Sequence, residues 1–532
     1  MIRACRLIRP ANKYALRRAI PLSKLAVVCI AILWRSTAAH ADACADLAAL
    51  KFANTTITAA ETISADTHSP PPGVPAAALN GLPSFCRVAA EIRPARDSDI
   101  KIEVWMPGSG WNGMLMGRGN GGFAGSIHYF EMGYGVRNGY ATVSTDTGHS
   151  GDSSDADWAL GHPEKVIDFG YRAVHEMTVK AKLIVKAFYA APPRHSYFDS
   201  CSNGGRQALM EAQRFPEDYD GITAGAPANN WTHDVAGFMW NMHALYDDPA
   251  SQIPPSKLPV IHSAFLKACD GQDGVKDGEI TDPRACHFDP GVLVCKDAET
   301  DSCLTVPQID ALKKIYSGIQ DSHGRTIYPG YMPGGELGSA GWAAWIDAPT
   351  IDRSMQYTLG LAFYRNMVYA DHQWNLHSFS VERDVKFTDK KLARILNATN
   401  PNLKPFAKRG GKLILYQGWN DAAIAPLNMV DYYDSVVAAV PIASDSFLRL
   451  YMVPGLQHCW GGSGAVDFDV FSSLKRWVES GEAPSSILAK QHRDPADVSS
   501  PVIITRPLCP YPEQARYKGS GDASAAASFE CK

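Results

Sequence analysis

The sequence predicts an α/β fold with a large insertion, and three observations lead to this prediction. Apolar stretches of strand length alternate with helical patterns in the first and last parts of the chain, as in a sheet covered by helices. The segment from Ser196 to Ala228 has the pattern of a strand, an abrupt turn, a helix and a second strand. The chain has 532 residues, which is too long for one compact core, so an inserted or second domain is expected.

The abrupt turn in this segment carries the first chemical signal. Its predicted neighbours are a strand at 197–199, a helix at 206 to about 214, and a strand within 220–227. A serine at such a turn, here Ser202, is held in a strained backbone with its hydroxyl exposed, and the turn requires small neighbours such as Gly204 and Gly205. Ser200 replaces the first glycine of the usual G-x-S-x-G pattern, so a Ser/Gly-rich turn without catalytic function is the alternative. Strand, turn, helix and strand form the core unit of an α/β-hydrolase.

The N-terminal 41 residues have the properties of an export signal. Eight Lys and Arg precede Asp42, whereas no acidic residue does. The apolar run from Leu25 to Trp34 is ten residues long, too short for a bilayer span of about 20 residues. Small residues around His40 are typical of a cleavage site. We therefore expect a soluble protein, secreted or periplasmic, that begins near Asp42 and has no membrane anchor after cleavage.

Loss of the signal changes the charge and the cysteine count. The remaining chain has 43 basic and 55 acidic residues, a net charge near −12, which argues against a nucleic-acid partner. Ten cysteines remain, and an even number in an exported protein indicates disulfides. The sequence alone does not fix their connectivity, but pairing neighbours along the chain leaves Cys201 for Cys459. The other expected pairs are Cys44 with Cys86, Cys269 with Cys286, Cys295 with Cys303, and Cys509 with Cys531.

The chain before the turn supplies a second candidate for the site. Antiparallel strands are predicted at 87–94 and 100–107, further strands at 113–117 and 140–144, and a long amphipathic helix within 164–190. The glycine-rich loop 118–125 lacks the Lys-Ser/Thr of a P-loop. In a hydrolase such a loop presents a backbone N–H to an oxyanion, and we prefer Gly122 over Gly121 for this role. A glycine-rich surface turn is the alternative.

The middle of the chain has a different character. Residues 229–400 show no strand–helix alternation but contain Trp, Tyr, four cysteines and several Asp-Gly turns, which predicts a lid inserted into a catalytic domain made of 42–228 and 401–532. After the lid, strands are predicted at 411–416 and 447–453, followed by a helix at about 466–480 and a tail closed by two cysteines.

Ser202, Asp421 and His458 each lie just past the C-terminal end of a predicted strand, where an open α/β sheet places its catalytic groups. We expect His458 to accept the serine proton and Asp421 to orient the imidazole. The backbone N–H groups of Asn203 and Gly122 would bind the oxyanion. If Ser202 and His458 are within hydrogen-bond reach, the adjacent cysteines, Cys201 and Cys459, also lie close together, which agrees with the pairing expected above.

A loop in the lid carries several carboxylates between Cys269 and Glu279. Oxygen ligands on a tight, glycine-rich loop suit Ca²⁺. The spacing is not that of an EF-hand, and a pair of solvated Asp-Gly turns is the alternative.

Together these residues resemble the tannase and feruloyl esterase family. The resemblance rests on the motifs Cys201-Ser202-x-Gly204-Gly205-Arg206, Gly225-Ala-Pro227, the aspartate loop 269–278, Gly418-x-x-Asp421 and His458-Cys459. It implies an α/β-hydrolase core with a lid between the strands that carry Ser and Asp, a disulfide beside Ser and His, and a structural Ca²⁺. The ligands implied are the carboxylates of Asp270, Asp273 and Asp277 and the carbonyls of Val275 and Glu279.

We therefore expect a serine carboxylic ester hydrolase that acts on small esters of aromatic (phenolic) acids through an acyl-enzyme on Ser202. A terephthalate monoester hydrolase is the alternative, and a serine peptidase of the same fold, which would share the triad, is less favoured. A non-catalytic binding module is disfavoured because all three triad positions are filled. Flat apolar walls for an aromatic ring are available from Trp342, Trp345, Phe363, Tyr364, Tyr369 and Trp374 in the lid. Arg365 is a candidate for contact with a substrate carboxylate. For any single one of these residues, however, ordinary lid core or an exposed arginine is the favoured explanation. The sequence does not indicate an oligomeric state.

Overall fold

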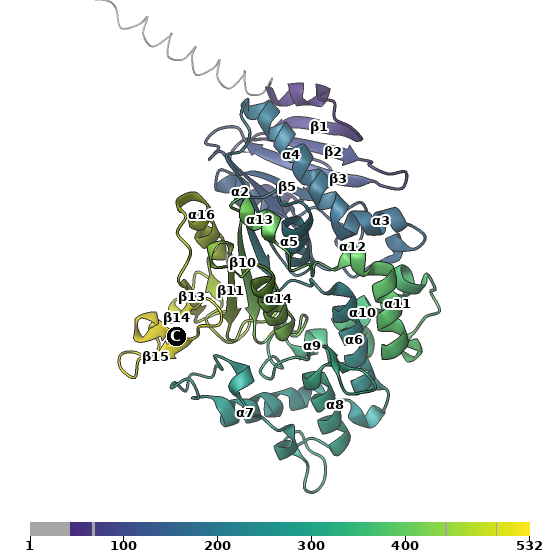
Figure 1. Ribbon diagram of the computed structural model, residues 1–532, viewed down its shortest axis with the longest axis vertical. Helices are drawn as coiled ribbons and strands as arrows, with labels where there is room; N and C mark the ends of the chain where they lie inside the picture. Colours follow the sequence, from purple (N-terminus) through teal and green to yellow (C-terminus); the bar gives the residue numbers. More distant parts are fainter. Residues whose placement is uncertain (1–42, 66–69, 442–443, 496) are drawn as a thin grey trace, which may run out of the picture.

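A nine-stranded sheet lies at the centre of the computed structural model, which describes residues 43–65, 70–441, 444–495 and 497–532 (Figure 1). The predicted export signal at 1–41 therefore lies outside the described residues. None of the helices described here combines the length and the apolar character that crossing a membrane requires.

The sheet is antiparallel at one edge and parallel over the rest. Its order is β1-β2-β3-β5-β4-β6-β7-β10-β11, with antiparallel pairing from β1 to β5 and parallel pairing from β5 to β11. The strands are β1 Thr55–Ile63, β2 Phe85–Ile92, β3 Ile100–Pro107, β4 Met114–Arg118, β5 Ala141–Thr145, β6 His195–Cys201, β7 Gly221–Gly225, β10 Lys412–Gly418 and β11 Leu448–Val453. The central strands are buried on both faces, as parallel strands covered by helices are.

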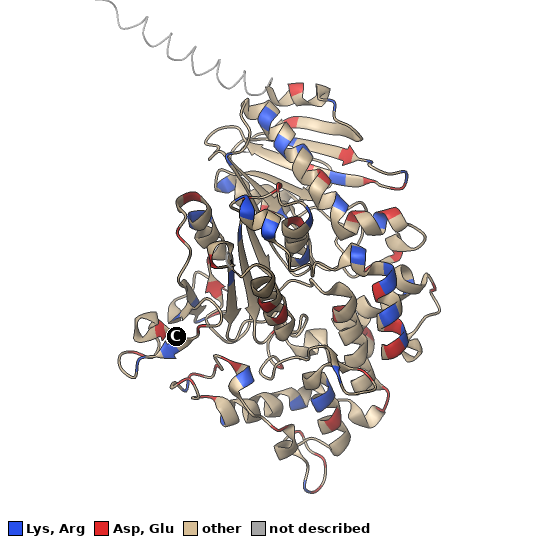
Figure 2. Ribbon diagram, in the orientation of Figure 1, with Lys and Arg blue, Asp and Glu red and all other residues tan. Residues whose placement is uncertain are grey.

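Helices cover both faces of the sheet. They are α2 Tyr129–Arg137, α3 Pro163–Ile167, α4 Ala173–Tyr189, α5 Asn203–Arg214, α13 Lys404–Lys408, α14 Pro426–Ala439, α15 Ser444–Phe447 and α16 Val470–Ser480. The apolar residues of α4, α5 and α14 share one core cluster with Leu413 and Leu415 of β10, whereas those of α16 share another with Ile414. Alternate residues of one strand thus face opposite helical layers. Charges of both signs are interspersed along outer helices such as α4, and the central strands carry few (Figure 2).

The predicted lid region is mainly helical. It contains α6 Trp231–Tyr246, α7 Leu258–Cys269, α8 Val306–Ser317, α9 Trp342–Trp345, α10 Met355–Ala362, α11 Lys386–Thr388 and α12 Arg394–Leu396, with a small hairpin of β8 Ile319–Gln320 and β9 Thr326–Tyr328. One large apolar cluster joins lid residues such as Phe363 to Phe123 and Ala422 of the core loops. The lid therefore packs directly onto the loops that follow the parallel strands (Figure 1).

Three elements differ from the prediction. Strand β1 was not expected, because its sequence, TTITAAETI, is mostly small or polar and gives a weak apolar alternation. Helix α5 begins at Asn203, three residues before the expected start, since Gly204 and Gly205 are poor helix formers but lie in its first turn. The helix expected at about 466–480 begins at Val470 as α16, and the residues before it form strand β12 Asp467–Phe468. In the tail, β13 Ile487–His492 and β14 Val502–Leu508 join β12 in a three-stranded sheet, and β15 Ala515–Tyr517 and β16 Phe529–Cys531 form a hairpin.

Candidate active site

Ser202 lies at the turn between β6 and α5 with φ 64° and ψ −128°. A non-glycine residue in this region of backbone space carries about 1–3 kcal/mol of strain. Backbone hydrogen bonds hold the turn, because the Ser202 N–H donates to the Gly225 carbonyl (2.9 Å) and its carbonyl accepts from Arg206 (3.0 Å). A Cβ on Gly205 would lie 2.4 Å from that same Gly225 oxygen. The close approach of helix and strand at this turn therefore requires glycine.

His458 lies in the loop after β11 and contacts both other members of the predicted triad. Its Nε2 is 2.8 Å from Ser202 Oγ, and its Nδ1 is 3.0 Å from Asp421 Oδ2. These distances are those of hydrogen bonds, and the order is that of a nucleophile, a base and a carboxylate that orients the base.

The carboxylate of Asp421 is buried and held from three directions. Its Oδ1 accepts hydrogen bonds from the N–H groups of Ala423 (2.8 Å) and Ile424 (2.9 Å). Its Oδ2 accepts from Gln417 Nε2 (2.8 Å) on β10 in addition to facing His458. These bonds fix the carboxylate so that it can hold one tautomer of the imidazole.

A disulfide connects Cys201 with Cys459, with an S–S distance of 2.05 Å. It joins the residues that flank the nucleophile and the histidine. The expected pairing is therefore confirmed here, and it is also confirmed for Cys44–Cys86, Cys269–Cys286, Cys295–Cys303 and Cys509–Cys531.

A cavity of about 260 Å³ opens beside Ser202 and His458. Its wall is largely aromatic and aliphatic; the lining includes Trp231, Val235, Phe238, Trp345, Met355, Leu359, Ile424 and Trp460. The Trp345 ring lies edge-on to the His458 ring, with centroids 5.1 Å apart. The site thus presents a hydroxyl and an imidazole to a flat apolar space, which suits an ester with an aromatic group.

Sequence and structure comparisons agree on the family. The chain matches the family described as tannase and feruloyl esterase over residues 86–532. It belongs to the tannase and feruloyl esterase family. The enzyme is therefore a carboxylic ester hydrolase with an α/β-hydrolase-like fold, and the resemblance found in the sequence is confirmed.

Individual relatives cover most of the chain. An uncharacterized esterase of Xanthomonas campestris pv. campestris is 39% identical over 93% of this enzyme and 92% of that protein. A probable feruloyl esterase B-2 of Aspergillus terreus is 32% identical over 84% of this enzyme and 86% of that protein. The crystal structure of feruloyl esterase B from Aspergillus oryzae superposes with a TM-score of 0.84 at 28% identity, covering 93% of this enzyme and all of that chain. A tannin acyl hydrolase from Aspergillus niger, at 23% identity, shares the fold with a TM-score of 0.73, over 92% of this enzyme and 95% of that chain.

The residues predicted to bind an oxyanion lie at the same cavity. Gly122 and Asn203 both line it together with Ser202. Gly122 has φ 48°, and an added Cβ would lie 2.2 Å from the Ser153 carbonyl oxygen. Asn203 is the first residue of α5, where the helix dipole favours negative charge. The loop conformation and the helix end thus suit the predicted role, which stays a prediction.

Most of the lid residues named from the sequence lie away from this cavity. Arg365 is on a π-helix at Phe363–Tyr369, where its Nε donates to the Trp374 carbonyl (2.8 Å), and it is not among the lining residues. Of the six aromatic residues expected to form walls, Trp345 lines the cavity. Trp342, by contrast, belongs to the buried apolar cluster of the lid.

Helix α6 supplies the walls that sequence reasoning missed. Trp231, Asp234, Val235 and Phe238 all come from it and line the cavity. Their spacing of three, four and seven residues places them on one face of a helix. This helical spacing, directly after the loop that follows β7, is the sequence signal that could have identified the cavity wall.

The aspartate loop at 270–279, which directly follows α7, has the donor chemistry of a Ca²⁺ site. Asp270, Asp273 and Asp277 offer carboxylates, and Gly271 and Gly274 keep the loop tight with positive φ. Each carboxylate also accepts bonds from its own loop, including Val275 N–H to Asp273 (3.0 Å). All the proposed donors are oxygen atoms on one loop, so the donor set fits a hard cation.

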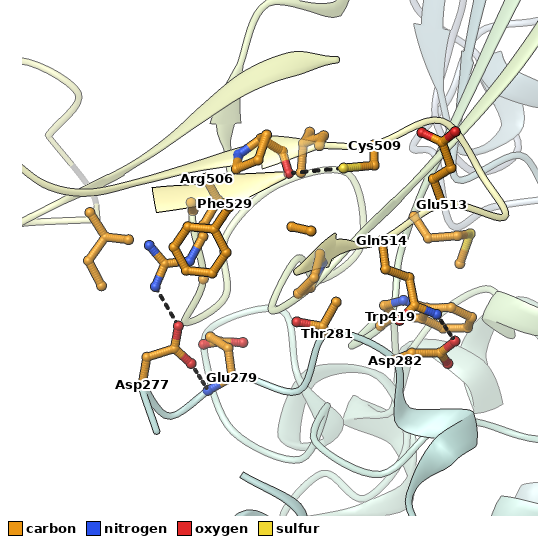
Figure 3. Close-up of a pocket in the computed structure, with 18 of the residues that line it drawn as sticks. Asp277, Glu279, Thr281, Asp282, Trp419, Arg506, Cys509, Glu513, Gln514 and Phe529 are labelled. Carbon is orange, nitrogen blue, oxygen red and sulfur yellow. Dashed lines mark hydrogen bonds and ion pairs between the residues drawn. The ribbon is translucent and has the colours of Figure 1, made fainter. Parts of the chain in front are cut away.

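Asp277 has a second partner outside the loop. Its Oδ2 accepts a hydrogen bond from the guanidinium group of Arg506 on β14 (2.6 Å). Glu279 lies beside Asp277 in the same pocket (Figure 3). In the part of the chain that the structure describes, His175, Glu211 and Asp218 form the one group of three acidic or histidine side chains whose ligand atoms all lie within 4.8 Å. The carboxylates of the loop are more widely spaced than that.

Proposed function

We propose that this enzyme hydrolyses small esters of aromatic, phenolic acids through an acyl-enzyme on Ser202. One observation carries the proposal: Ser202 Oγ, 2.8 Å from His458 Nε2, opens onto a cavity walled by Trp231, Phe238 and Trp345. Aromatic rings pack well against such walls, and an ester carbonyl beside the hydroxyl is placed for attack. The family match and the feruloyl esterase relatives favour this substrate class over terephthalate monoesters or peptides.

The reaction has two steps, acylation of Ser202 and hydrolysis of the acyl-enzyme. As Ser202 Oγ attacks the ester carbonyl, His458 Nε2 accepts its proton, and Asp421 stabilises the imidazolium. The N–H groups of Asn203 and Gly122 donate to the negative oxygen of the tetrahedral intermediate. His458 then gives the proton to the departing alcohol, and the acyl group stays on Ser202. A water molecule, deprotonated by His458, releases the aromatic acid by the same route.

The test compares wild type and Ser202→Ala on methyl ferulate, methyl gallate, a terephthalate monoester and a peptide amide. We expect wild type to hydrolyse the two phenolic esters and to leave the amide intact. Serine-triad variants can lose roughly 10⁶ in turnover, so Ser202→Ala should be inactive with an unchanged circular dichroism spectrum. Near-normal turnover in this variant would remove Ser202 as nucleophile. Preference for the terephthalate monoester would overturn the substrate class.

The proposal includes action outside the cytoplasm. Five disulfides occur among the described residues, and disulfides persist in oxidising compartments. N-terminal sequencing of the protein recovered outside the cytoplasm should begin near Asp42. Recovery of the full-length chain with free thiols in the cytoplasm would contradict it.

The proposal also includes a structural Ca²⁺ in the lid. The carboxylates of Asp270, Asp273 and Asp277 and the carbonyls of Val275 and Glu279 would hold it, and the ion would tie the loop together without entering the reaction.

A further inference from the structure

A carboxyl group lies in the otherwise apolar wall of the catalytic cavity. Asp234, on α6, lines the cavity between Trp231 and Phe238, and it is 2% exposed. An ionised carboxylate in such surroundings is costly unless it is paired. Among the described residues, no Lys, Arg or His forms an ion pair with Asp234. Its one side-chain partner in that part of the chain is the hydroxyl of Tyr328, which donates to Oδ1 at 2.9 Å.

The protonation state of Asp234 follows from these surroundings. Burial raises the pKa of Asp234 well above its usual range, the Tyr328 hydrogen bond opposes this rise, and the negative charge of Asp421 adds to it. This upward shift of the pKa favours the protonated, neutral form of the carboxyl group. A neutral carboxyl group has an O–H that donates and a second oxygen that accepts, so it can bond a hydroxyl group in both directions.

We infer that Asp234, supported by Tyr328, forms a subsite for a ring hydroxyl on the aromatic acid of the substrate. The inference rests on the proposed function, because it concerns the acyl group that Ser202 receives. The cavity that holds Asp234 also holds Ser202, so one bound acyl group contacts both. Its aromatic ring lies against Trp231 and Phe238 while its hydroxyl bonds to the carboxyl group of Asp234.

This subsite makes the enzyme selective for hydroxylated aromatic acids. A site whose buried polar group bonds a substrate hydroxyl rejects the analogue that lacks it, because the polar group is then left without a partner. A ring carboxylate, as in a terephthalate monoester, would bring a negative charge into the apolar wall and near the carboxylate of Asp421, which is unfavourable. The subsite therefore favours phenolic esters over analogues without the ring hydroxyl and over terephthalate monoesters.

A purely structural role for the same contact must be distinguished. Tyr331, three residues after Tyr328, donates to the carbonyl of Ala423 (2.9 Å), and the N–H of Ala423 donates to Asp421. Loss of the Asp234–Tyr328 bond could thus disturb the triad through the lid. A disturbed triad lowers turnover for every ester alike, whereas a lost subsite changes the ratio between esters.

The test measures kcat and KM for methyl ferulate and methyl 3-methoxycinnamate, which differ only by the ring hydroxyl. Wild type should favour methyl ferulate at least tenfold in kcat/KM. Asp234→Leu should abolish that preference, chiefly by raising KM for methyl ferulate, and Asp234→Asn, which still donates and accepts, should keep part of it. Tyr328→Phe should weaken the preference by lowering kcat/KM for methyl ferulate more than for the deoxy ester. This variant provides the test if Asp234→Leu does not fold.

A matched control is available in the same lid. Asp347 is also buried and within 3.4 Å of a tyrosine hydroxyl, that of Tyr246, but it does not line the cavity. Asp347→Asn should leave the ester ratio unchanged. An unchanged ratio in all Asp234 and Tyr328 variants, or equal losses on both esters, would overturn the subsite while leaving the esterase function intact. A wild-type enzyme that hydrolyses neither ester would instead overturn the proposed function.

Discussion

The Cα atoms of Cys201 and Cys459 lie 6.0 Å apart and are bridged by a disulfide that spans 258 residues of sequence. Each cysteine is the direct neighbour of a residue of the proposed triad, so the bridge connects the turn at Ser202 to the loop that carries His458 by one covalent link. Both loops are also held strained, since Ser202 and Cys459 have positive φ. The disulfide therefore fixes the base relative to the nucleophile.

Replacement of both cysteines by Ala should reduce turnover more than it raises KM. A shift of about 1 Å between base and nucleophile can cost about a hundredfold in rate, and a crosslink over so long a loop can contribute about 4–5 kcal/mol to stability. Steady-state kinetics and thermal melting measure the two effects. The matched control is the Cys295–Cys303 pair, which closes 8 residues in the lid and should leave kcat unchanged. Unaltered kcat in the first double variant would contradict the proposed role.

The sequence was sufficient to predict that Ser202, Asp421 and His458 lie together, because their signals are local. Ser202, Asp421 and His458 each follow an apolar strand, and the direction of a strand end is set by the sheet. The residues of the lid do not follow strands of the central sheet, so their positions cannot be predicted in this way. Arg365 lies on a π-helix whose turn directs its guanidinium to the Trp374 carbonyl, and sequence spacing does not encode that turn. The walls from α6 were missed because an aromatic residue at helical spacing is equally typical of a core.

Arg206 should be hard to replace, even by lysine. It is fully buried, and its guanidinium donates to the carbonyls of Phe169 (3.0 Å), Gly170 (2.8 Å) and Leu396 (3.2 Å). Burial lowers its pKa to about 9. Through these three hydrogen bonds, Arg206 joins the first turn of α5 to two other helical segments.

Arg206→Lys leaves some of these carbonyls without donors, at about 1–3 kcal/mol each, so we expect a loss of about 3–5 kcal/mol in the free energy of unfolding. Urea denaturation measures this loss. Arg214→Lys on the same helix is the control, because Arg214 is exposed and lies over the ring of Tyr171. A loss no larger than in that control would show that the carbonyls find other partners.

Chelation should destabilise the lid before the core, because the proposed Ca²⁺ ties a loop with few apolar residues of its own. EDTA should lower the melting temperature, and added Ca²⁺ should restore it. The melting temperature of Asp273→Asn, with or without added Ca²⁺, should equal that of wild type in EDTA. If melting is unaffected by EDTA and the purified enzyme contains no calcium, the ligand assignment at Asp270, Asp273 and Asp277 is wrong.

Asp146, at the end of β5, should make stability depend on pH. Its Oδ1 accepts from the N–H groups of Lys101 (2.9 Å) and Gly148 (2.8 Å), whereas its Oδ2 is buried without a partner among the described residues. Burial raises the pKa of Asp146 from 3.8 to about 7, although the two N–H bonds oppose this rise. The folded state therefore binds the proton more tightly than the unfolded state does.

The sign of the effect follows from that difference. The contribution to stability is fully present below about pH 4 and is lost as the pH rises through about 7. Asp146→Asn cannot ionise, so its stability relative to wild type should increase between pH 5 and pH 8. About two units of the pKa shift lie in this interval, so the increase should be at most about 3 kcal/mol at roughly 1.4 kcal/mol for each unit. Urea denaturation at both pH values measures the difference, with Glu482→Gln on an exposed loop as the control. A stability gap between Asp146→Asn and wild type that stays constant from pH 5 to pH 8 would show that Asp146 keeps its charge in the folded enzyme.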